Sequence, residues 1–261
     1  MKLDARVALV TGASRGIGEA IARRFAAEGA AVAVSARTIN EGDHPLSGSI
    51  TSTVTSIKDA GGRAVAVAAD LARPEDRRVL IDSVERELGA IDILVNNAAV
   101  TYFEPTETFS ARHYALMLEV QVRAPFELAQ LVLPGMRARK QGWILNISSG
   151  AARHPEGPPY NRRMGAGTVY GMCKAALERF TSGLAAEMYE DGIAVNALSP
   201  SGLVPTPGVV YHGLDRGVPA DALEPAEVMA EAALALCSGD PAALTGRITY
   251  ARPLLAEFST S

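Results

Sequence analysis

Short apolar runs alternate with longer amphipathic stretches along almost the whole chain. The runs are rich in Val, Ile, Leu and Ala and have the length of buried strands, whereas the stretches between them have the apolar spacing of helices. This alternation predicts a parallel sheet whose strands are joined by helices. The predicted strands are 7–10, 31–35, 64–68, 91–96, 143–148, 194–198 and 247–250, and the predicted helices are 16–28, 50–60, 74–88, 111–139, 169–191 and 225–238.

The chain has the size of one large α/β domain. Its 261 residues are enough to bury a substantial core, and a second domain is not required. Two stretches, 38–49 and 151–168, interrupt the alternation without a change of composition, so we interpret them as insertions within a single domain spanning 1–261. Four of the predicted helices are followed directly by a glycine that suits a left-handed helix cap, namely Gly29, Gly61, Gly89 and Gly192.

Composition and charge exclude several classes of function. The formal net charge is -4, which leaves no basic excess for a phosphate backbone, so nucleic-acid binding is not expected. No run approaches the roughly 18 apolar residues of a membrane helix, and the first is too short for a signal peptide, so we expect a cytoplasmic protein without membrane contact. Cys173 and Cys237 lack a second thiol or histidine at metal-ligand spacing, which disfavours a disulfide framework and a metal site.

A glycine-rich turn follows the first predicted strand and opens the first predicted helix. Positions 11–18 read Thr-Gly-Ala-Ser-Arg-Gly-Ile-Gly. Glycines let the backbone turn sharply and approach a ligand, and a helix N-terminus presents free N–H groups to a pyrophosphate. Because the turn lies between strand and helix at the start of the chain, we favour a dinucleotide site over a merely structural turn. The turn residues assigned to the cofactor are Gly12, Ser14, Arg15, Gly16, Ile17 and Gly18.

The end of the second predicted strand indicates which dinucleotide binds. An acidic residue there would accept hydrogen bonds from the adenosine ribose, but this chain has Arg37 followed by Thr38. Together with Arg15, Arg37 can converge on a 2′-phosphate, which favours NADP over NAD; solvated surface arginines are the alternative. His44, in the loop that follows, is either a further contact to that phosphate or a solvated histidine.

Asp70 closes the third predicted strand, with Leu71 directly after it. The carboxylate is placed to hydrogen-bond the edge of the adenine, and both residues are assigned to the cofactor. The competing role for Asp70 is a cap for the helix that begins at Pro74.

Two residues with catalytic potential begin the helix predicted at 169–191. Tyr170 and Lys174 are four residues apart, so they lie on one face of the helix with the ammonium beside the phenol. A free phenol titrates near pH ~10, and a neighbouring cation stabilises the phenolate, so the pair predicts a tyrosine that exchanges protons near neutral pH. Such a spacing also arises by chance. Upstream, Ser149 is placed to donate a hydrogen bond to a substrate carbonyl or to cap a turn, and Ser148 suits either role.

Taken in order along the chain, these features resemble the short-chain dehydrogenase/reductase family. Each motif is weak alone, but together they are specific and cover essentially the whole chain. The resemblance implies a single-domain α/β fold, a Rossmann-type doubly wound sheet of about seven parallel strands flanked by helices. The cofactor half would span about 1–150 and the catalytic and substrate half about 151–261. The matching segments are 11–18, Asp70, 96–99, Ser149, Tyr170 with Lys174, and 196–200 leading to Thr206.

The resemblance also implies a set of roles. Tyr170 would pass a proton to or from the substrate oxygen, Lys174 would lower the phenol pKa and hold the nicotinamide ribose, and Ser149 would fix the substrate oxygen. Val204 and Thr206 would bind the nicotinamide carboxamide. The two longest predicted helices resemble the dimer-forming pair of the family, so a homodimer or homotetramer is expected. Cofactor contacts beyond those already assigned would be Asn97, Ala98, Tyr170, Lys174, Pro200, Val204 and Thr206.

Four departures from the family pattern stand out. Gln121 occupies the position of an Asn that supports a water-mediated proton relay to the lysine, and it offers the same amide one methylene further out, so it is kept as a catalytic candidate. An insertion at 153–167 borders the substrate pocket, and its Arg162 and Arg163 either meet an anion or face solvent. Ser201 splits a Pro-Gly pair, and 249–253 lacks the usual Asp-Gly-Gly.

The sequence therefore predicts an oxidoreductase that prefers NADP and acts on a small ketone or secondary alcohol. A non-catalytic NADP-binding sensor or scaffold protein of the same fold is the alternative, supported by Gln121 and the altered segment after Pro200. A third possibility is an epimerase or dehydratase. Only about 60 residues follow Pro200, however, which leaves little room for the longer substrate domain of such relatives.

Overall fold

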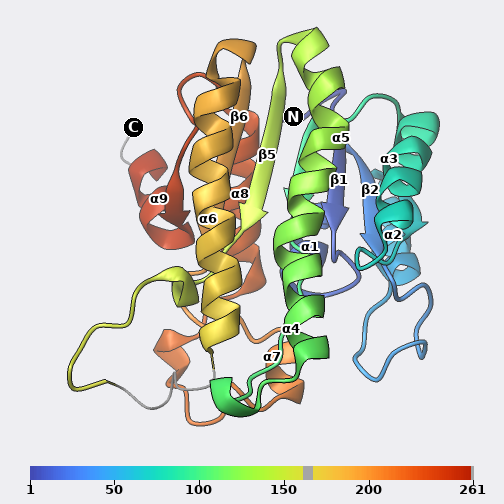
Figure 1. The fold of residues 1–261 in the computed structure, drawn as a ribbon. Helices are drawn as coiled ribbons and strands as arrows, with labels where there is room; N and C mark the ends of the chain where they lie inside the picture. The colour runs from blue at the N-terminus through green and yellow to red at the C-terminus, as the bar shows by residue number, and fades with distance from the viewer. Residues whose placement is uncertain (161–166, 260–261) are drawn as a thin grey trace.

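A single seven-stranded sheet forms the centre of the computed structural model, which describes residues 1–160 and 167–259 (Figure 1). All strand pairs in it are parallel, in the order β3-β2-β1-β4-β5-β6-β7. The direction of chain progression reverses between β1 and β4, where open α/β sheets bind ligands. The strands are β1 (Val7–Thr11), β2 (Ala31–Ala36), β3 (Arg63–Ala68), β4 (Ile93–Asn96), β5 (Gly142–Ile147), β6 (Ile193–Ser199) and β7 (Ile248–Tyr250).

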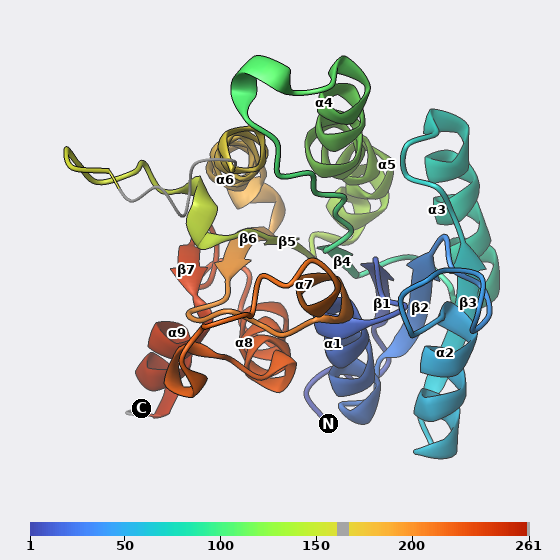
Figure 2. The ribbon, with the colours of Figure 1, turned by 90° about the horizontal axis from the view of Figure 1, so that it is seen from below.

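Helices cover both faces of the sheet, as predicted (Figure 2). Helices α1, α2, α8 and α9 pack on one face, and α3, α5 and α6 pack on the other. Alternate residues of each central strand serve the two cores: Ala8 and Val10 face the first, whereas Val7 and Leu9 face the second. The helices are α1 (Gly16–Ala27), α2 (Ile50–Asp59), α3 (Pro74–Leu88), α4 (Ala111–Leu118), α5 (Ala124–Arg139), α6 (Thr168–Met188), α7 (Pro207–Tyr211), α8 (Ala226–Ser238) and α9 (Ala251–Ser259).

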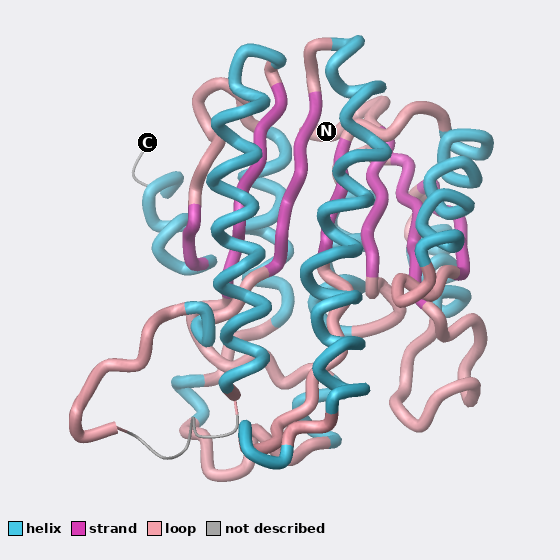
Figure 3. Tube along the Cα trace, viewed as in Figure 1, coloured by secondary structure: helices cyan, strands magenta, loops and turns pink. Residues whose placement is uncertain are grey.

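The long connections gather at the carboxyl ends of the strands (Figure 3). Short 3-10 turns lie within them at η1 (Thr106–Thr108), η3 (Gly150–Ala152) and η6 (Ala220–Ala222), and another, η5 (Tyr189–Asp191), ends α6. The four glycines expected to cap helices all have positive φ, between 67° and 100°, and Gly192 adopts the left-handed helical conformation, whereas Gly89 has an extended ψ of -176°.

Two elements differ from the prediction. The helix predicted at 111–139 is interrupted by a π turn, η2 (Glu119–Arg123), so that α4 and α5 flank one wider turn. The chain after β7 forms α9, a helix that was not among those predicted, with Pro253 in its first turn. Proline is tolerated in the first turn of a helix because its missing N–H has no intrahelical partner at that position.

Neither a membrane-crossing helix nor a metal site was found in the described part of the chain. None of its helices combines the length and the apolar character that crossing a bilayer requires. No group of three or more His, Cys, Asp or Glu side chains among the described residues is arranged to hold a metal ion.

Candidate active site

A cleft of about 1190 Å³ opens at the carboxyl ends of the central strands. It receives side chains from the glycine turn after β1, the ends of β2 and β3, and the segments that follow β4, β5 and β6. Most of the predicted site residues line it. The exceptions are Gly16, Gly18 and Gln121. The predicted cofactor-binding and catalytic residues on its wall are Gly12, Ser14, Arg15, Ile17, Arg37, Thr38, Asp70, Leu71, Asn97, Ala98, Ser149, Tyr170, Lys174, Pro200, Val204 and Thr206.

The glycine turn requires its glycines. Gly12 and Gly16 have φ of +63° and +60°, and a Cβ at Gly12 would lie 2.7 Å from the Cα of Ala98. A Cβ at Gly16 would lie 2.9 Å from Cγ2 of Thr206, and one at Gly18 would overlap the Asn97 side chain. These contacts leave no room for a side chain at Gly16 or Gly18. They let the segments after β4 and β6 close onto the turn.

Thr11 and Asn97 join the turn after β1 to the turn after β4. The Thr11 hydroxyl donates to the Val95 carbonyl at 3.1 Å and accepts from the main-chain N–H groups of Asn97 and Ala98 at 3.1 and 3.2 Å. The Asn97 side-chain amide donates to the carbonyls of Thr11 and Gly12 at 2.9 and 3.1 Å. Both turns are therefore held in a fixed relation at the point where the sheet reverses direction.

The N-terminus of α1 fits a phosphate group. Its N-cap residue, Arg15, makes no side-chain cap hydrogen bond, whereas Ser49 caps α2 with a complete capping box. The first N–H groups of a helix need an acceptor, and the positive end of the helix dipole favours an anion there. The residues of the glycine turn thus fit the pyrophosphate of a dinucleotide.

Arg15 and Arg37 both line the cleft beyond this turn, but Arg15 is held by hydrogen bonds whereas Arg37 is exposed. Arg15 donates to the carbonyls of Leu46, Ser47 and Gly48 at 3.2, 2.8 and 2.7 Å, so it also holds the 38–49 loop in place. Arg37 is exposed at the end of β2. Burial lowers the pKa of Arg15, and the charge of Arg37 lowers it further, so the two guanidiniums are close enough to repel each other.

His44 also lies in the cleft, beside these two cations. Its Nδ1 accepts a hydrogen bond from the Leu46 N–H at 3.1 Å. Burial, Arg15 and Arg37, in that order, lower the pKa of His44. The 38–49 loop therefore adds an imidazole to the two guanidiniums in the region predicted to receive a 2′-phosphate.

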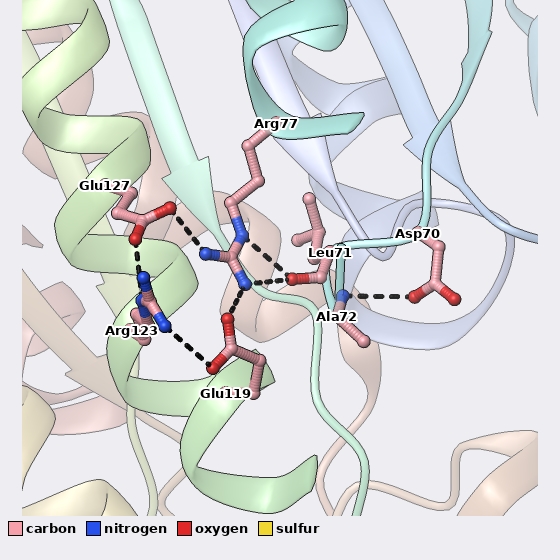
Figure 4. A network of polar contacts seen from close by, with 7 residues as sticks. All are labelled: Asp70, Leu71, Ala72, Arg77, Glu119, Arg123 and Glu127. Carbon is pink, nitrogen blue, oxygen red and sulfur yellow. Dashed lines mark hydrogen bonds and ion pairs between the residues drawn. The ribbon is translucent and has the colours of Figure 1, made fainter. Parts of the chain in front are cut away.

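Hydrogen bonds hold Asp70 and Leu71 in place, and those to Leu71 come from a buried arginine (Figure 4). The Asp70 carboxylate accepts from the Ala72 N–H at 3.1 Å, so it stabilises the turn before α3, while Arg73 is the N-cap of that helix. Arg77, fully buried on α3, donates twice to the Leu71 carbonyl, at 2.9 and 2.5 Å. The position of the predicted adenine contacts therefore depends on Arg77.

The same guanidinium reaches the π turn. Arg77 pairs with Glu119 on η2 and with Glu127 on α5, the latter at 2.5 Å, and Arg123 contacts both carboxylates from the solvent side (Figure 4). The sequence analysis missed this network. The i,i+4 spacing of Glu119, Arg123 and Glu127 signals helix-surface ion pairs, but nothing in the local sequence identifies a partner 42 residues away.

Ser149, Tyr170 and Lys174 meet on the opposite side of the cleft. Ser149 hydrogen-bonds the Tyr170 phenol and also accepts from the Ala151 N–H at 3.2 Å, so it caps the η3 turn, and its contact to a substrate carbonyl stays a prediction. Lys174 is buried, and its Nζ lies 5.7 Å from the centroid of the Tyr170 ring. Ser148 instead donates to the Glu178 carboxylate at 2.7 Å, which leaves Ser149 as the hydroxyl of the site.

The electrostatics of this trio differ from the expectation. Burial raises the pKa of Tyr170, whereas the hydrogen bond from Ser149 lowers it and only partly compensates. The Nζ of Lys174 donates a hydrogen bond to the Ile147 carbonyl at 2.9 Å, so the ammonium is anchored to β5 beside the Tyr170 ring. Burial also lowers the pKa of Lys174 itself to about 8. Tyr170 is therefore a protonated phenol at neutral pH.

Gln121 lies behind the cleft, in the π turn. It is buried, and its Nε2 donates to the Val100 carbonyl at 2.7 Å. Its Oε1 is buried without a hydrogen-bond partner in the described part of the chain. A buried amide oxygen of this kind needs a donor such as an ordered water.

Ser201 is built into the segment after β6 rather than extruded from it. Its N–H donates to the fully buried Glu224 carboxylate at 3.1 Å, and its hydroxyl accepts from the Arg252 N–H at 3.0 Å. The Arg252 side chain in turn pairs with Glu224 at 3.0 Å. Val204 and Thr206 therefore still line the cleft despite the inserted residue. Arg162 and Arg163 lie outside the described residues.

Comparisons with known proteins agree with this geometry. A family model described as short chain dehydrogenase matches residues 6–212. The 7alpha-hydroxysteroid dehydrogenase of Escherichia coli (strain K12) is 32% identical over 255 residues, which cover 95% of this chain and 93% of that protein. A short chain dehydrogenase of Pseudocercospora fijiensis (strain CIRAD86) is 36% identical over 201 residues, or 76% of this chain, but the match spans only 60% of that protein.

The fold is shared with solved structures as well. A short chain dehydrogenase from Burkholderia cenocepacia J2315, solved in complex with NADP, superposes with a TM-score of 0.78 at 30% identity. The match covers 96% of this chain and 97% of that one. The likeness therefore extends over the sheet and both helical layers.

Proposed function

The chain belongs to the short-chain dehydrogenase/reductase family, and on this premise we propose that it is an NADP(H)-dependent oxidoreductase of ketones or secondary alcohols. The observation that carries the proposal is the meeting of Ser149, Tyr170 and Lys174 in the same cleft as the glycine turn. A hydroxyl, a phenol and an ammonium at one wall can bind a carbonyl oxygen and protonate it.

The roles follow from the contacts. When bound, the nicotinamide group supplies a hydride to the carbonyl carbon or accepts one from the alcohol carbon. Ser149 and Tyr170, already hydrogen-bonded to each other, hold the substrate oxygen between them. In reduction, Tyr170 gives its proton to that oxygen, and its raised pKa keeps the phenol protonated until then. The ammonium of Lys174 then stabilises the phenolate and helps return the proton.

We propose that Gln121 supports the return of the proton to Tyr170. Its unpartnered Oε1 is suited to hold a water molecule on a path that leads to Lys174 from within the protein. The amide of Gln121 would then act one methylene further out than the asparagine of the family pattern.

We expect the pH profile to report Lys174. The catalytic efficiency of ketone reduction, kcat/KM, should fall as the pH rises through about 8, because Lys174 loses its charge there while Tyr170 stays protonated. In Lys174→Arg, whose guanidinium stays charged, this alkaline limb should move to higher pH even if the rate is lower. Rates measured from pH 6 to pH 10, about two units either side of the Lys174 pKa, test this; an unmoved limb in the variant would assign it to another group.

The preference for NADP rests on Arg37, with Arg15 and His44 beside it. In Arg37→Asp, we expect NADPH affinity to fall by about 10- to 100-fold, the range for a lost charge-assisted hydrogen bond, while NADH affinity holds or rises. Titration of both cofactors by fluorescence measures this directly. Arg63→Asp, at the other end of the neighbouring strand β3, makes the same charge change as a control. Equal affinities for both cofactors in the unaltered protein would refute the preference.

A homo-oligomer formed through α5 and α6 is part of the proposal. Phe126 on α5 is 46% exposed and packs edge-on against Phe180 on α6, with ring centroids 5.7 Å apart. Two aromatic rings at the surface of adjacent long helices suit burial against a second copy.

Spectrophotometric screening separates the proposed enzyme from a cofactor-binding scaffold. The purified protein should oxidise NADPH with at least one member of a panel of aliphatic, aromatic and cyclic ketones. Tight NADPH binding without turnover of any ketone, or of the matching alcohols with NADP, would favour the non-catalytic alternative.

A further inference from the structure

Arg153 lines the substrate side of the cleft, near Ser149, Tyr170 and Lys174. Arg153 follows η3, which continues directly from Ser149, and its Cζ lies 4.2 Å from the centroid of the Tyr250 ring. Tyr250 ends β7 and borders the same turn, since a Cβ at Gly150 would lie 4.0 Å from the Tyr250 hydroxyl. Arg153 and Tyr250 both line the cleft with Ser149 and Tyr170.

The Tyr250 ring positions the guanidinium of Arg153, but no carboxylate among the described residues pairs with it. Stacking on an aromatic ring uses the face of a guanidinium and leaves its in-plane N–H donors available. Among the described residues, Arg153 forms no ion pair and no side-chain hydrogen bond. Glu156 on its own loop and Asp221 on the cleft wall both lie beyond ion-pair distance from it.

Arg252, the other arginine on this side of the cleft, is already engaged. It donates to the Glu224 carboxylate at 3.0 Å and to the Leu223 carbonyl at 3.2 Å. Of the two described arginines on this side, Arg153 is therefore the one with donors to offer a ligand. A planar fork of N–H groups matches a carboxylate, which it binds with two parallel hydrogen bonds.

Apolar side chains also lie near the catalytic tyrosine. Phe103 meets the Tyr170 ring edge-on with centroids 6.1 Å apart, and it is 41% exposed. Leu116, Leu203 and Val209 line the same cleft. A substrate held at Tyr170 thus lies in a cleft that offers both apolar side chains and the guanidinium of Arg153.

We propose that the substrate is a keto acid, or in the reverse direction a hydroxy acid, whose carboxylate binds Arg153. This inference rests on the proposed function. The carbonyl oxygen lies at Ser149 and Tyr170, the apolar part of the molecule lies toward Phe103, and the carboxylate takes no part in the chemistry. The carbonyl carbon gains the hydride, its oxygen gains the Tyr170 proton, and the carboxylate only fixes which way round the molecule binds.

Matched pairs of substrates test the proposal. Several keto acids of different chain length, each with its own methyl ester, are compared by kcat/KM with NADPH. In the unaltered protein at least one acid should exceed its ester, and Arg153→Gln should lower kcat/KM for that acid by about 10- to 100-fold, mainly through KM. The value for the ester should change by less than about threefold, since an ester offers Arg153 no charge.

Two further variants distinguish binding from a structural effect. Tyr250→Phe keeps the ring under Arg153 and should keep the preference for the acid, whereas Tyr250→Leu removes the ring and should weaken it. Arg86→Gln, on the exposed surface of α3, makes the same charge change away from the cleft and should leave the preference intact.

Each outcome bears on a different conclusion. Turnover of esters as good as that of every acid, or an unchanged preference in Arg153→Gln, overturns the role of Arg153 and leaves the proposed function standing. Failure to turn over any acid or ester, while another ketone of the panel is reduced, overturns this inference alone. Failure with every ketone and alcohol tested, with NADPH bound, overturns the proposed function and this inference with it.

Discussion

In Tyr170→Phe, NADPH-dependent ketone reduction is expected to fall by about 10²- to 10⁴-fold, the range contributed by a positioned general acid. The substitution removes only the hydroxyl that hydrogen-bonds Ser149. The ring remains, so the edge-on contact with Phe103 and the packing beside Lys174 are kept. The loss should therefore appear in kcat, measured by steady-state kinetics at saturating NADPH.

Cofactor affinity serves as the internal control for this variant. NADPH binding should change little, because the glycine turn and Arg37 lie on the other side of the cleft. Tyr250→Phe is a matched control, as it removes a phenolic hydroxyl from the same cleft and should keep most of the activity. If Tyr170→Phe kept more than about a tenth of the rate, a group other than Tyr170 would have to supply the proton.

Arg77→Leu is expected to destabilise the fold strongly. Arg77 is fully buried between Glu119, Glu127 and the Leu71 carbonyl, so its loss leaves two carboxylates and one carbonyl without their main partner. Breaking a buried ion pair from one side costs about 3 to 5 kcal/mol. Because both carboxylates are 24% exposed, we expect the lower end, about 3 kcal/mol in the free energy of unfolding by urea.

Arg123→Leu is the control, since Arg123 contacts the same two carboxylates from solvent at 57% exposure. An exposed pair of this kind contributes about 0.2 to 1 kcal/mol. If the two variants were equally stable, the network would owe little to burial.

The pH dependence gives a second test of the network. Burial raises the pKa of Glu127, but hydrogen bonds from Arg77 and Arg123 outweigh it, so the net pKa is lowered. The stability that this carboxylate contributes is therefore present above its unfolded pKa of about 4.3 and is lost as the pH falls through its folded value. The difference in the free energy of unfolding between Arg77→Leu and the unaltered protein should accordingly become smaller at acidic pH.

The sheet could be predicted from the sequence because its strands are buried on both faces. A strand such as β1 (Val7–Thr11) is apolar at every core position, and this leaves a continuous run that cannot be confused with a surface segment. All seven predicted strands are present, with ends within two residues of the prediction. The glycines that cap helices were equally clear, because few other residues adopt positive φ.

The π turn and the charges of the site could not be read in this way. The segment Glu119–Arg123 keeps a helical pattern, and its partner Arg77 comes from another helix. The pKa of Tyr170 depends on burial, and the spacing of Tyr170 and Lys174 says nothing about that. Spacing placed the lysine beside the phenol, but only the fold revealed that its ammonium donates to the Ile147 carbonyl.

The two sides of the cleft rest on separate supports. The nucleotide side is held by Thr11, Asn97 and Arg77, whereas the walls around Arg153 and Ser201 are held by Tyr250, Glu224 and Arg252. Thr206 against Gly16 is a close contact that crosses between them. Substitutions around Arg153 and Ser201 can therefore change the substrate specificity without disturbing the nucleotide side. Descendants with new substrates would keep the same dinucleotide-binding site.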